Sequence, residues 1–315
     1  MAQQANHALP AGLQLEEYTI TRQLSLGGFS IVYLATDGEG SRVAIKEYLP
    51  NSLALRGEGE IKPLITTDHQ SAFRYGMKCF FEEGRALARL SHPNVIRVLN
   101  FFRANDTVYM VMEYERGRTL QEFIQTHRGE VTERFIRGVF TRLLNGLREV
   151  HSHKLLHLDL KPSNIYLRSD NTPVLIDFGA ARQTLSTDQP MLKPMYTPGF
   201  ASPEHYGSRK ELGPWSDIYS VGASMYACIA GSAPQAANER YQKDTLVPAM
   251  MRWEGEYSDR LLEIIDWCLN LNHFYRPQSV FALQKALVET VTPPTPKESP
   301  NWLNRFVDKY KKASR

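Results

Sequence analysis

The spacing of apolar residues changes partway along the chain, and this change limits the fold more than any other feature of the sequence. Between Tyr18 and Met112 the pattern favours short β-strands, such as residues 42–48 (RVAIKEY) and 107–114 (TVYMVMEY). Beyond a joint at residues 114–119 the apolar period is mainly helical. We therefore predict a strand-rich part followed by a helix-rich part, which makes an α+β protein.

Two segments have the period of an amphipathic helix. Among the predicted strands, one helix is indicated by residues that recur at short helical spacing, namely Met77, Phe80, Phe81, Gly84, Leu87 and Leu90. In residues 132–153 a single apolar stripe consists of Ile136, Phe140, Leu143, Leu147 and Val150. A chain of 315 residues is long enough to give each part a core of its own.

We divide the chain into three regions. Residues 1–14 are polar and are predicted to be flexible, residues 15–292 form the folded domain, and residues 293–315 are a Pro-rich and then basic tail. Within the domain we place an N-lobe at about 15–113 and a C-lobe at about 117–292. The joint between the lobes coincides with the change of apolar period.

Composition and charge exclude several classes of protein. A formal net charge of +3 is too small to indicate nucleic acid as a partner. The N-terminus lacks the basic start and apolar stretch of a secretory signal, and no run of 18 apolar residues predicts a transmembrane segment. Cys79, Cys228 and Cys268 are far apart, lack metal-type spacing and suit a reducing compartment. We therefore expect a cytoplasmic protein.

The tail at residues 301–315 leaves two interpretations open. Trp302, Phe306 and Tyr310 recur at helical spacing among basic residues, which suits a short amphipathic helix in weak contact with a membrane surface or a partner protein. A solvated basic tail is the alternative.

A turn with two adjacent glycines lies at residues 24–35 (LSLGGFSIVYLA). The glycines would let the backbone approach a ligand closely, although the same pattern also occurs in plain hairpin turns. Lys46 follows three apolar residues in the next strand, where its ammonium group could meet phosphate oxygens. A buried lysine needs an acidic partner, and Glu83 and Glu82 on the predicted helix are the candidates.

The polar residues of HLDLKPSN (157–164) suit phosphoryl transfer. Asp159 could accept or orient a substrate hydroxyl, and Lys161 could neutralise the charge that builds on the transferred group. Asn164, and Asp177 at the end of the apolar run VLID, offer the hard oxygen ligands that Mg²⁺ prefers when it bridges nucleotide phosphates. The ordered set predicts a phosphotransferase site.

In combination, these motifs resemble those of the eukaryotic-type Ser/Thr protein kinases, which bacteria also carry. The resemblance runs from about Leu15 to about Glu289. It implies the bilobal protein kinase fold, with an antiparallel-sheet N-lobe that carries one main helix and a helical C-lobe. It also implies an enzyme that uses ATP with Mg²⁺, or with Mn²⁺ in its place, and transfers the γ-phosphate to Ser/Thr hydroxyls of protein substrates.

The resemblance assigns roles to the residues around the reacting phosphate. Asp159 would be the catalytic base, Lys161 would contact the phosphate, and Asn164 and Asp177 would bind the metal ion. Lys161, two residues after the catalytic aspartate, points to Ser/Thr rather than Tyr as the acceptor.

The nucleotide site implied by the resemblance begins with Lys46, which would bind the α- and β-phosphates. Its partner would be Glu83, which the distance to the His-Pro-Asn turn favours over Glu82. Met112 would be the gatekeeper beside the adenine. The full set implied to bind the nucleotide is Leu24, Ser25, Gly27, Gly28, Ser30, Val32, Ala44, Lys46, Glu83, Met112, Glu113, Glu115 and Tyr166.

Other residues would hold this site in place. Glu204 would pair with Arg276, Asp217 would anchor the catalytic loop from below, and the hydroxyl of Thr197 would reach the catalytic aspartate and lysine. A column that connects the lobes would consist of Val98, Leu87, Phe178 and His157.

The sequence departs from the family pattern in its glycine-rich loop and in its length. Ser25 and Ser30 replace the first and third glycines, which preserves close phosphate approach if neither position requires a positive φ. Residues 47–71 form an extra segment between Lys46 and Glu83. This insertion could pack over the helix of Glu83 and regulate it, or it could be a passive surface loop.

Leu158 replaces the arginine that commonly precedes the catalytic aspartate. That arginine pairs with a phosphorylated residue of the activation loop, so its loss removes a bidentate partner for an anion. We predict that activity does not depend on phosphorylation of the candidate residues, which are Thr184, Ser186 and Thr187.

Two other functions remain as alternatives. A pseudokinase that binds nucleotide as a scaffold would explain the two serines in the glycine-rich loop, but no catalytic Lys, Asp or Asn is missing. A small-molecule kinase shares the Asp and Asn spacing but lacks the activation segment and the Ser-Pro-Glu element found at residues 202–204.

Overall fold

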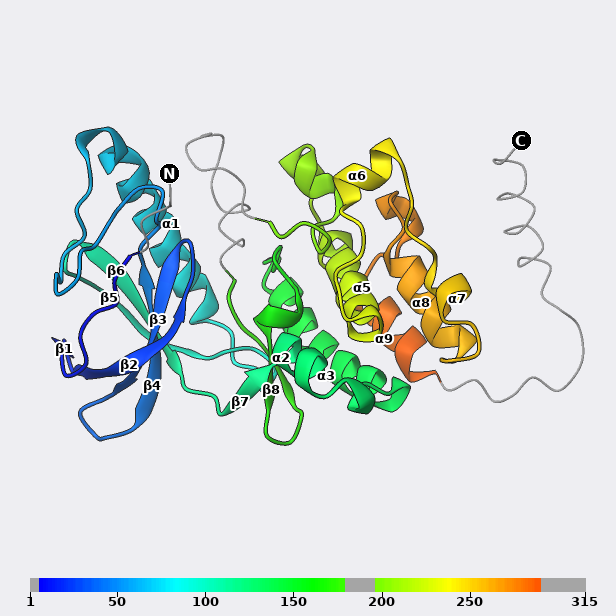
Figure 1. The fold of residues 1–315 in the computed structure, drawn as a ribbon, viewed down its shortest axis with the longest axis horizontal. Coiled ribbons are helices and arrows are strands. Elements are labelled where there is room, and N and C mark those ends of the chain that lie inside the picture. The colour runs from blue at the N-terminus through cyan, green and yellow to red at the C-terminus, as the bar shows by residue number, and fades with distance from the viewer. Residues whose placement is uncertain (1–5, 179–195, 290–315) are drawn as a thin grey trace, which may run out of the picture.

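The computed structural model describes residues 6–178 and 196–289, which form two lobes side by side (Figure 1). The lobe at the N-terminal side contains a six-stranded sheet and helix α1, and the other lobe is mostly helical. The predicted α+β, bilobal architecture is therefore confirmed. None of the helices within the described residues is long and apolar enough to cross a membrane.

The N-lobe sheet is antiparallel throughout and has the order β1-β2-β3-β4-β6-β5. Its strands are β1 (Gln14–Leu15), β2 (Tyr18–Leu26), β3 (Ser30–Thr36), β4 (Arg42–Tyr48), β5 (Val98–Ala104) and β6 (Thr107–Glu113). Strand β4 begins with alternating burial, exposed at Arg42 and buried at Val43, and every side chain from Ile45 to Tyr48 is buried. The two strands predicted at 42–48 and 107–114 are both present.

Helix α1 (Gln70–Leu87) covers this sheet. The ring of Tyr48, at the end of β4, lies 5.2 Å from that of Phe73 and 5.8 Å from that of Phe80 on the helix. Gly76 is needed at this contact, because a Cβ there would lie 1.9 Å from the Tyr48 hydroxyl oxygen. The predicted helix is confirmed, although Leu90 lies beyond its end.

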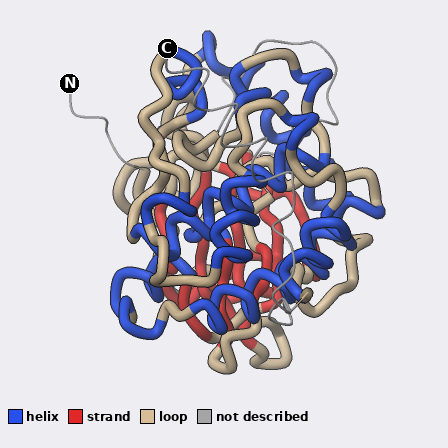
Figure 2. The backbone as a smooth tube through the Cα atoms, turned by 90° about the vertical axis from the view of Figure 1, so that its right-hand side faces the viewer, coloured by secondary structure: helices blue, strands red, loops and turns tan. Residues whose placement is uncertain are grey.

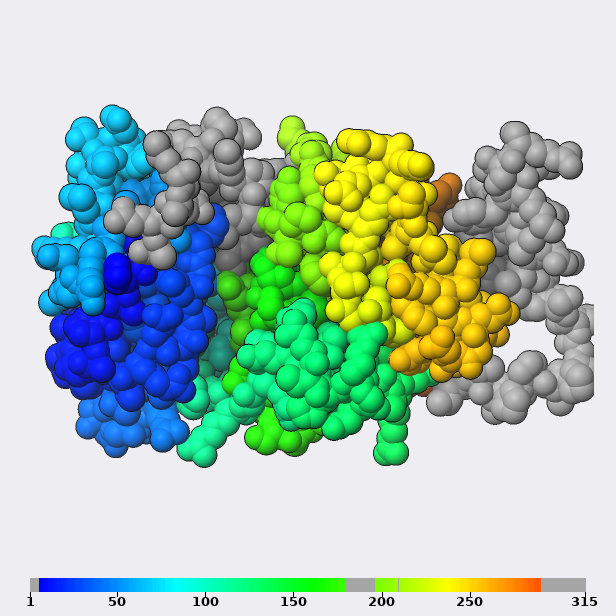
Figure 3. Space-filling model, viewed as in Figure 1, coloured from blue at the N-terminus to red at the C-terminus, as the bar shows by residue number. Residues whose placement is uncertain are grey.

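The N-terminal segment corrects one prediction. Residues 1–14 were expected to be flexible, but Asn6 and Leu9 are buried against the N-lobe. The Asn6 side chain accepts a hydrogen bond from the backbone N–H of Arg56 at 2.6 Å and donates to Asn51 Oδ1 at 2.7 Å. This packing could not be predicted from the sequence, because it depends on a few polar hydrogen bonds rather than on an apolar pattern. In the space-filling view, the first described residues lie as a dark blue patch on their own lobe (Figure 3).

The insertion at residues 47–71 packs rather than standing free. Leu49 is fully buried, and Leu55 and Leu64 form a β-bridge with backbone hydrogen bonds of 3.0 and 2.7 Å. The segment then leads directly into α1 through a short 3-10 turn, Thr67–His69. The segment is therefore packed, as one of the two alternatives expected, and regulation of the Glu83 helix by it stays a prediction.

The C-lobe is built around two long helices, and in the rotated view its helices lie in front of the strands of the N-lobe (Figure 2). Its helices are α2 (Leu120–Thr126), α3 (Glu133–Ser152), α5 (Pro214–Ala230), α6 (Ala237–Gln242), α7 (Ala249–Arg252), α8 (Asp259–Cys268) and α9 (Val280–Val288). A small sheet of β7 (Gly117–Thr119), β8 (Ile165–Arg168) and β9 (Pro173–Leu175) lies beside them. The predicted stripe of α3 is buried along its length.

Helix α5 is the centre of the C-lobe, since every residue from Ser216 to Ile229 is buried. Gly222 allows α8 to approach closely, because a Cβ at this position would lie 2.3 Å from Cys268 Cβ. A helix enclosed on all sides is a rigid base, and it carries Asp217, which holds the loop described next.

Candidate active site

The loop between α3 and β8 is fixed by one buried carboxylate. Asp217 accepts hydrogen bonds from the backbone N–H groups of His157 and Leu158 at 2.9 and 2.8 Å, and from His151 Nε2 at 2.7 Å. Burial alone would raise the pKa of Asp217, but these donors and nearby positive charge hold it below its usual value. The geometry expected for Asp217 is therefore observed.

The carboxylate of Asp159 is held by donors on both of its oxygens. Lys161 Nζ donates to Oδ2 at 2.7 Å, and the Thr197 hydroxyl donates to Oδ1 at 2.9 Å. Lys161 also donates to the Thr197 hydroxyl oxygen at 2.6 Å, so three groups from two segments form one cluster. Both Asp159 and Lys161 remain partly accessible, with side chains about one-fifth exposed at 19% and 21%.

Asn164 ends the short 3-10 helix Pro162–Asn164 and is buried beneath Asp159. Its Nδ2 donates to the backbone oxygen of Asp159 at 2.8 Å and to Asp159 Oδ2 at 3.0 Å. Its backbone oxygen accepts from the N–H of Ile176 at 3.0 Å, which brings the end of β9 beside the loop. Within the described residues Asn164 Oδ1 accepts no hydrogen bond, so this oxygen can serve as a ligand.

Asp177 follows β9 in a left-handed conformation, with φ 59°. Its Oδ1 lies 2.5 Å from Lys46 Nζ, which is ion-pair distance. Glu83, the partner expected for Lys46, is buried on α1, and its pair with Lys46 stays a prediction.

His157 and Phe178 connect the loop to the segment after β9. Their ring centroids lie 4.4 Å apart, and His157 Nε2 lies 3.2 Å from the backbone oxygen of Ile176. Burial lowers the pKa of His157, so the ring is neutral and donates from Nε2. Leu87 and Val98, the other members of the predicted column, are also buried in the core.

The expected nucleotide residues lie on neighbouring strands of the sheet. Val32 is paired with Lys46, and Ala44 with Met112, so these side chains share one region of its surface. Leu24, Val32, Ala44, Met112, Glu115 and Tyr166 are each partly buried. The strand pairing brings Val32, Ala44, Lys46 and Met112 together, and the role of the whole set in nucleotide binding stays a prediction.

The β2–β3 turn is held by the insertion. The backbone oxygens of Gly28 and Phe29 accept hydrogen bonds from Asn51 N and Leu49 N, each at 2.9 Å. Neither Ser25 nor Ser30 has a positive φ, so the condition under which serine preserves the loop is met. No motif in the sequence predicted that residues 49–51 would support this turn.

Two further ion pairs brace the C-lobe around the site. Glu204 pairs with Arg276 at 2.8 Å, as expected, and Ser216 donates to the same carboxylate at 2.8 Å. Glu115 forms a bidentate pair with Arg168 of β8, a partner that the sequence analysis missed. Arg168 was 53 residues away and carried no motif, so no signal in the sequence pointed to it.

Two side-chain groups of the site have oxygen atoms that suit a magnesium ion, whose other ligands would be phosphates and water. Asn164 Oδ1 and the Asp177 carboxylate are hard oxygen ligands on adjacent segments, as the bond from Ile176 to Asn164 shows. No cluster of three or more His, Cys, Asp or Glu side chains that could hold a metal alone occurs in the part of the chain that the structure describes. Mg²⁺ commonly takes one or two protein ligands and completes its shell with phosphate and water.

The bilobal fold, the loop around Asp159 and the strand lysine together define a phosphotransferase of the protein kinase type. The chain belongs to the protein kinase family, because residues 18–288 match the protein kinase domain.

Two curated relatives carry the same domain. The human serine/threonine-protein kinase Nek2 is 32% identical over 246 residues, which cover 74% of this chain and 55% of that protein. Serine/threonine-protein kinase B of Synechocystis sp. is 31% identical over 234 residues, which cover 70% of this chain and 39% of that protein. The chain thus spans about half or less of these two relatives.

Solved structures agree with the fold. The apo form of PpkA-294 superposes with a TM-score of 0.79 at 34% identity, covering 89% of this chain and 99% of that one. A mutant PknI kinase domain of Mycobacterium tuberculosis reaches a TM-score of 0.65 at 19% identity, covering 89% and 98%, and shows that the fold is shared.

Proposed function

We propose that this chain is an ATP-dependent protein kinase that transfers the γ-phosphate to Ser/Thr hydroxyls of protein substrates. The observation that carries the proposal is the cluster of Asp159, Lys161 and Thr197. Asp159 acts as the base for an acceptor hydroxyl, and Lys161 stabilises the charge on the transferring phosphoryl group. Thr197 hydrogen-bonds to both groups and so fixes the Asp159 carboxylate relative to the Lys161 ammonium.

The nucleotide binds between the β2–β3 turn and β8. Lys46 holds the α- and β-phosphates, while Val32, Ala44 and Tyr166 enclose the adenine beside the gatekeeper Met112. The backbone of Glu113 and Glu115 meets the adenine edge, and the turn from Leu24 to Ser30 covers the phosphates. The strand pairing that brings Val32, Ala44, Lys46 and Met112 together, each of the three apolar side chains being only partly buried, supports this placement.

Asn164 and Asp177 would hold the Mg²⁺ ion, or Mn²⁺ in its place, and the ion would neutralise charge on the phosphates. The pair between Lys46 and Asp177 then has to open, so that Lys46 turns to the phosphates and Asp177 to the metal. Nucleotide and metal are therefore expected to bind together rather than separately.

Activity is proposed not to depend on phosphorylation of the activation loop. Leu158 replaces the phosphate-binding arginine and is itself 1% exposed, so an apolar side chain fills this position. The candidate residues Thr184, Ser186 and Thr187 lie outside the described residues. Changing all three to Ala should leave turnover within about threefold, on the order of 0.7 kcal/mol; a collapse of turnover would refute this part.

Labelled ATP with Mg²⁺ and a generic acceptor protein tests the main proposal. Asp159→Asn should abolish label transfer, whereas Asp68→Asn, a matched loss of charge on an exposed turn, should leave it unchanged. Equal transfer by the protein and by Asp159→Asn would exclude the mechanism. Nucleotide binding without any transfer would instead support the pseudokinase alternative.

Label on a small alcohol but on no protein would favour the small-molecule kinase. The Glu204–Arg276 pair, which braces the segment after Thr197, supports a protein substrate. The proposed cytoplasmic location and the contact through residues 301–315 stay predictions, and the tail lies outside the described residues.

A further inference from the structure

The side chain of Asn6 is enclosed by a loop that the first half of the insertion forms. It is 3% exposed, although asparagine is polar and residues 6–9 lie outside any helix or strand. Its Nδ2 donates to Asn51 Oδ1 at 2.7 Å and to the backbone oxygen of Ala54 at 3.2 Å, and its Oδ1 accepts from the backbone N–H of Arg56 at 2.6 Å. Buried backbone groups need partners, and this one amide supplies them.

Residues 6–9, which we call the anchor segment, are also held on either side of this amide. The N–H of His7 donates to the backbone oxygen of Arg56 at 3.1 Å, and Arg56 Nε donates to the backbone oxygen of His7 at 2.9 Å. Leu9 is 4% exposed, and its N–H donates to the Tyr33 hydroxyl oxygen at 3.2 Å. The anchor segment is therefore joined both to the insertion and to β3.

The other side of the same loop holds the β2–β3 turn. Leu49 and Asn51 are the residues whose backbone N–H groups donate to the turn, as described above. Gly28 in this turn is exposed, and glycine leaves its backbone many conformations in the absence of such bonds. Asn51 takes part in both contacts, because its N–H donates to the turn and its Oδ1 accepts from Asn6.

We propose that Asn6 is a positioning residue for the β2–β3 turn and acts on it through Asn51. The inference rests on the proposed function, because there the turn covers the phosphates of the nucleotide. A turn that is already ordered loses less conformational entropy when the nucleotide binds, so the anchor segment raises nucleotide affinity. This coupling is reciprocal, and bound nucleotide therefore stabilises the anchor segment.

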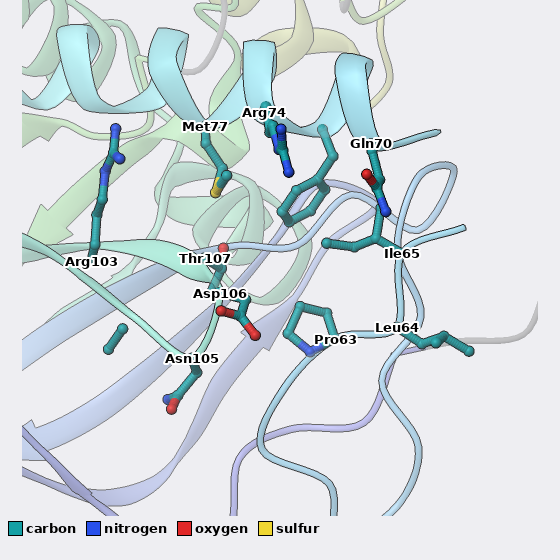
Figure 4. A pocket seen from close by; sticks show the side chains of 12 residues that line it. Pro63, Leu64, Ile65, Gln70, Arg74, Met77, Arg103, Asn105, Asp106 and Thr107 are labelled. Carbon is teal, nitrogen blue, oxygen red and sulfur yellow. The ribbon is translucent and has the colours of Figure 1, made fainter. Parts of the chain in front are cut away.

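The second half of the insertion lies outside this connection. Residues 63–65 face α1 and the β5–β6 hairpin across a cavity of about 660 Å³, whose lining includes neither Asn6 nor Asn51 (Figure 4). The side chain of Leu64 is 75% exposed. Leu64→Gln therefore tests whether any change in the insertion has the effect that we expect of the loop around Asn6.

Steady-state kinetics separate positioning from a general loss of structure. Asn6→Ala should raise KM for ATP by at least about threefold, because it removes buried hydrogen bonds, and should leave kcat at saturating ATP within about twofold. A smaller fraction of folded protein would instead lower kcat and leave KM unchanged. Gln14→Ala, which removes an exposed amide in β1, and Leu64→Gln should change neither constant by more than about twofold.

Variants of Asn51 test the route, and this residue is only partly buried. Asn51→Ala removes the acceptor for Asn6, whereas Asn51→Pro also removes the N–H that donates to Gly28. Proline suits this position, the second of a turn in which the N–H of Leu53 donates to the backbone oxygen of Pro50 at 2.9 Å. Asn51→Pro should raise KM for ATP by at least about twofold more than Asn51→Ala does.

A double variant tests whether the two side chains act together. Asn6→Ala combined with Asn51→Ala should raise KM for ATP by less than the product of the two single effects, because both remove one shared hydrogen bond. Effects that multiply in full would show that Asn6 does not act through Asn51 and would overturn the proposed route.

Binding and hydrogen exchange test the same inference without turnover. In Asn6→Ala the Kd for ADP with Mg²⁺, measured by calorimetry, should rise by at least about threefold, and the amides of residues 27–33 should exchange faster. In the unsubstituted protein, ADP with Mg²⁺ should slow exchange at residues 6–9.

The outcomes that overturn the inference differ from those that concern the proposed function. Unchanged exchange at residues 27–33 in Asn6→Ala would overturn the positioning role, whether or not the protein binds nucleotide. An unchanged KM for ATP together with an unchanged Kd for ADP would overturn the effect on affinity. A failure of the proposed function is read separately, from the absence of ADP binding or label transfer in the unsubstituted protein.

Discussion

The ion pair of Glu47 and Arg56 gives the sharpest prediction about the N-lobe. Both side chains have 0% exposure, and Arg56 donates to the two carboxylate oxygens at 2.6 and 2.7 Å. The hydroxyls of Tyr33 and Tyr109 donate to the same carboxylate at 2.7 and 2.9 Å. Because Glu47 follows Lys46 in β4, this pair fixes the end of the strand that carries the lysine.

Each single substitution leaves one buried charge without its partner. Arg56→Met leaves the carboxylate of Glu47, and Glu47→Gln leaves the guanidinium while keeping an oxygen for the tyrosine hydroxyls. Each should lower the free energy of unfolding of the N-lobe by about 3–5 kcal/mol. The double variant contains neither charge, so its loss in free energy of unfolding should be no larger than that of either single variant. The two substitutions would then show a coupling energy of about 3 kcal/mol.

The assay must report on the N-lobe itself. All four tryptophans, at positions 215, 253, 267 and 302, lie in the C-lobe or the tail, so their fluorescence would follow the other lobe. Hydrogen exchange of the β4 amides, measured by mass spectrometry, reports on the required strand. Its slowest amides should exchange faster by about two to three and a half orders of magnitude in each single variant.

The control is a second ion pair of the insertion. The side chains of Lys62 and Asp106 are 67% and 62% exposed. Lys62→Met should therefore change the free energy obtained from exchange of the β4 amides by less than about 0.5 kcal/mol. If the double variant lost as much stability as the sum of the two single ones, the two charges would not be coupled and the reasoning would fail.

Three other predictions concern the loop around Asp159. Thr197→Ala should lower kcat by at least about tenfold while Thr197→Ser retains it, since one hydroxyl joins Lys161 to Asp159, the proposed catalytic base. Equal kcat in both variants would contradict this role. Asp217→Asn should lower the free energy of unfolding of the C-lobe by about 3 kcal/mol, read from tryptophan fluorescence in urea, because an amide can accept from only some of its donors; an unchanged midpoint would argue against it. Burial lowers the pKa of His157 and of His205, so below a pH of about 6.5 the unfolded chain binds more protons than the folded protein does. As the pH is lowered through this range, the free energy of unfolding should therefore fall by up to about 2.7 kcal/mol per pH unit for the two groups together. Urea midpoints at a pH of about 7.5 and about 5.5 measure this fall, His205→Gln should reduce it, and a flat profile would refute the assignment.

The mutual placement of the proposed catalytic residues could be predicted because their spacing along one loop fixes their geometry. Asp159 and Asn164 are five residues apart, and the short helix between them brings the amide to the carboxylate. Glu204 and Arg276 could be placed only through the family resemblance, since 72 residues separate them. Local spacing and a known pattern therefore account for different parts of the site.

The contact of Lys46 with Asp177 could not be predicted in the same way. It depends on how the end of β9 lies relative to β4, whereas the pair of Lys46 with Glu83 stays a prediction. Asn6 and Arg56 were missed for a related reason. Their bonds cross 50 residues of chain and leave no periodic or compositional signal.

Leu158 is held in place through its backbone. Its φ of 61° is in the left-handed region, which costs a leucine on the order of 1–2 kcal/mol. The conformation is held from both sides, since its N–H donates to Asp217 at 2.8 Å and its backbone oxygen accepts from His205 Nε2 at 3.0 Å. The backbone N–H of Ser202 donates to His205 Nδ1 at 3.1 Å, which fixes the proton on Nε2. Helix α5 and the Ser-Pro-Glu element therefore hold this loop in place through constitutive bonds, which supports the proposal that it needs no phosphate to order it.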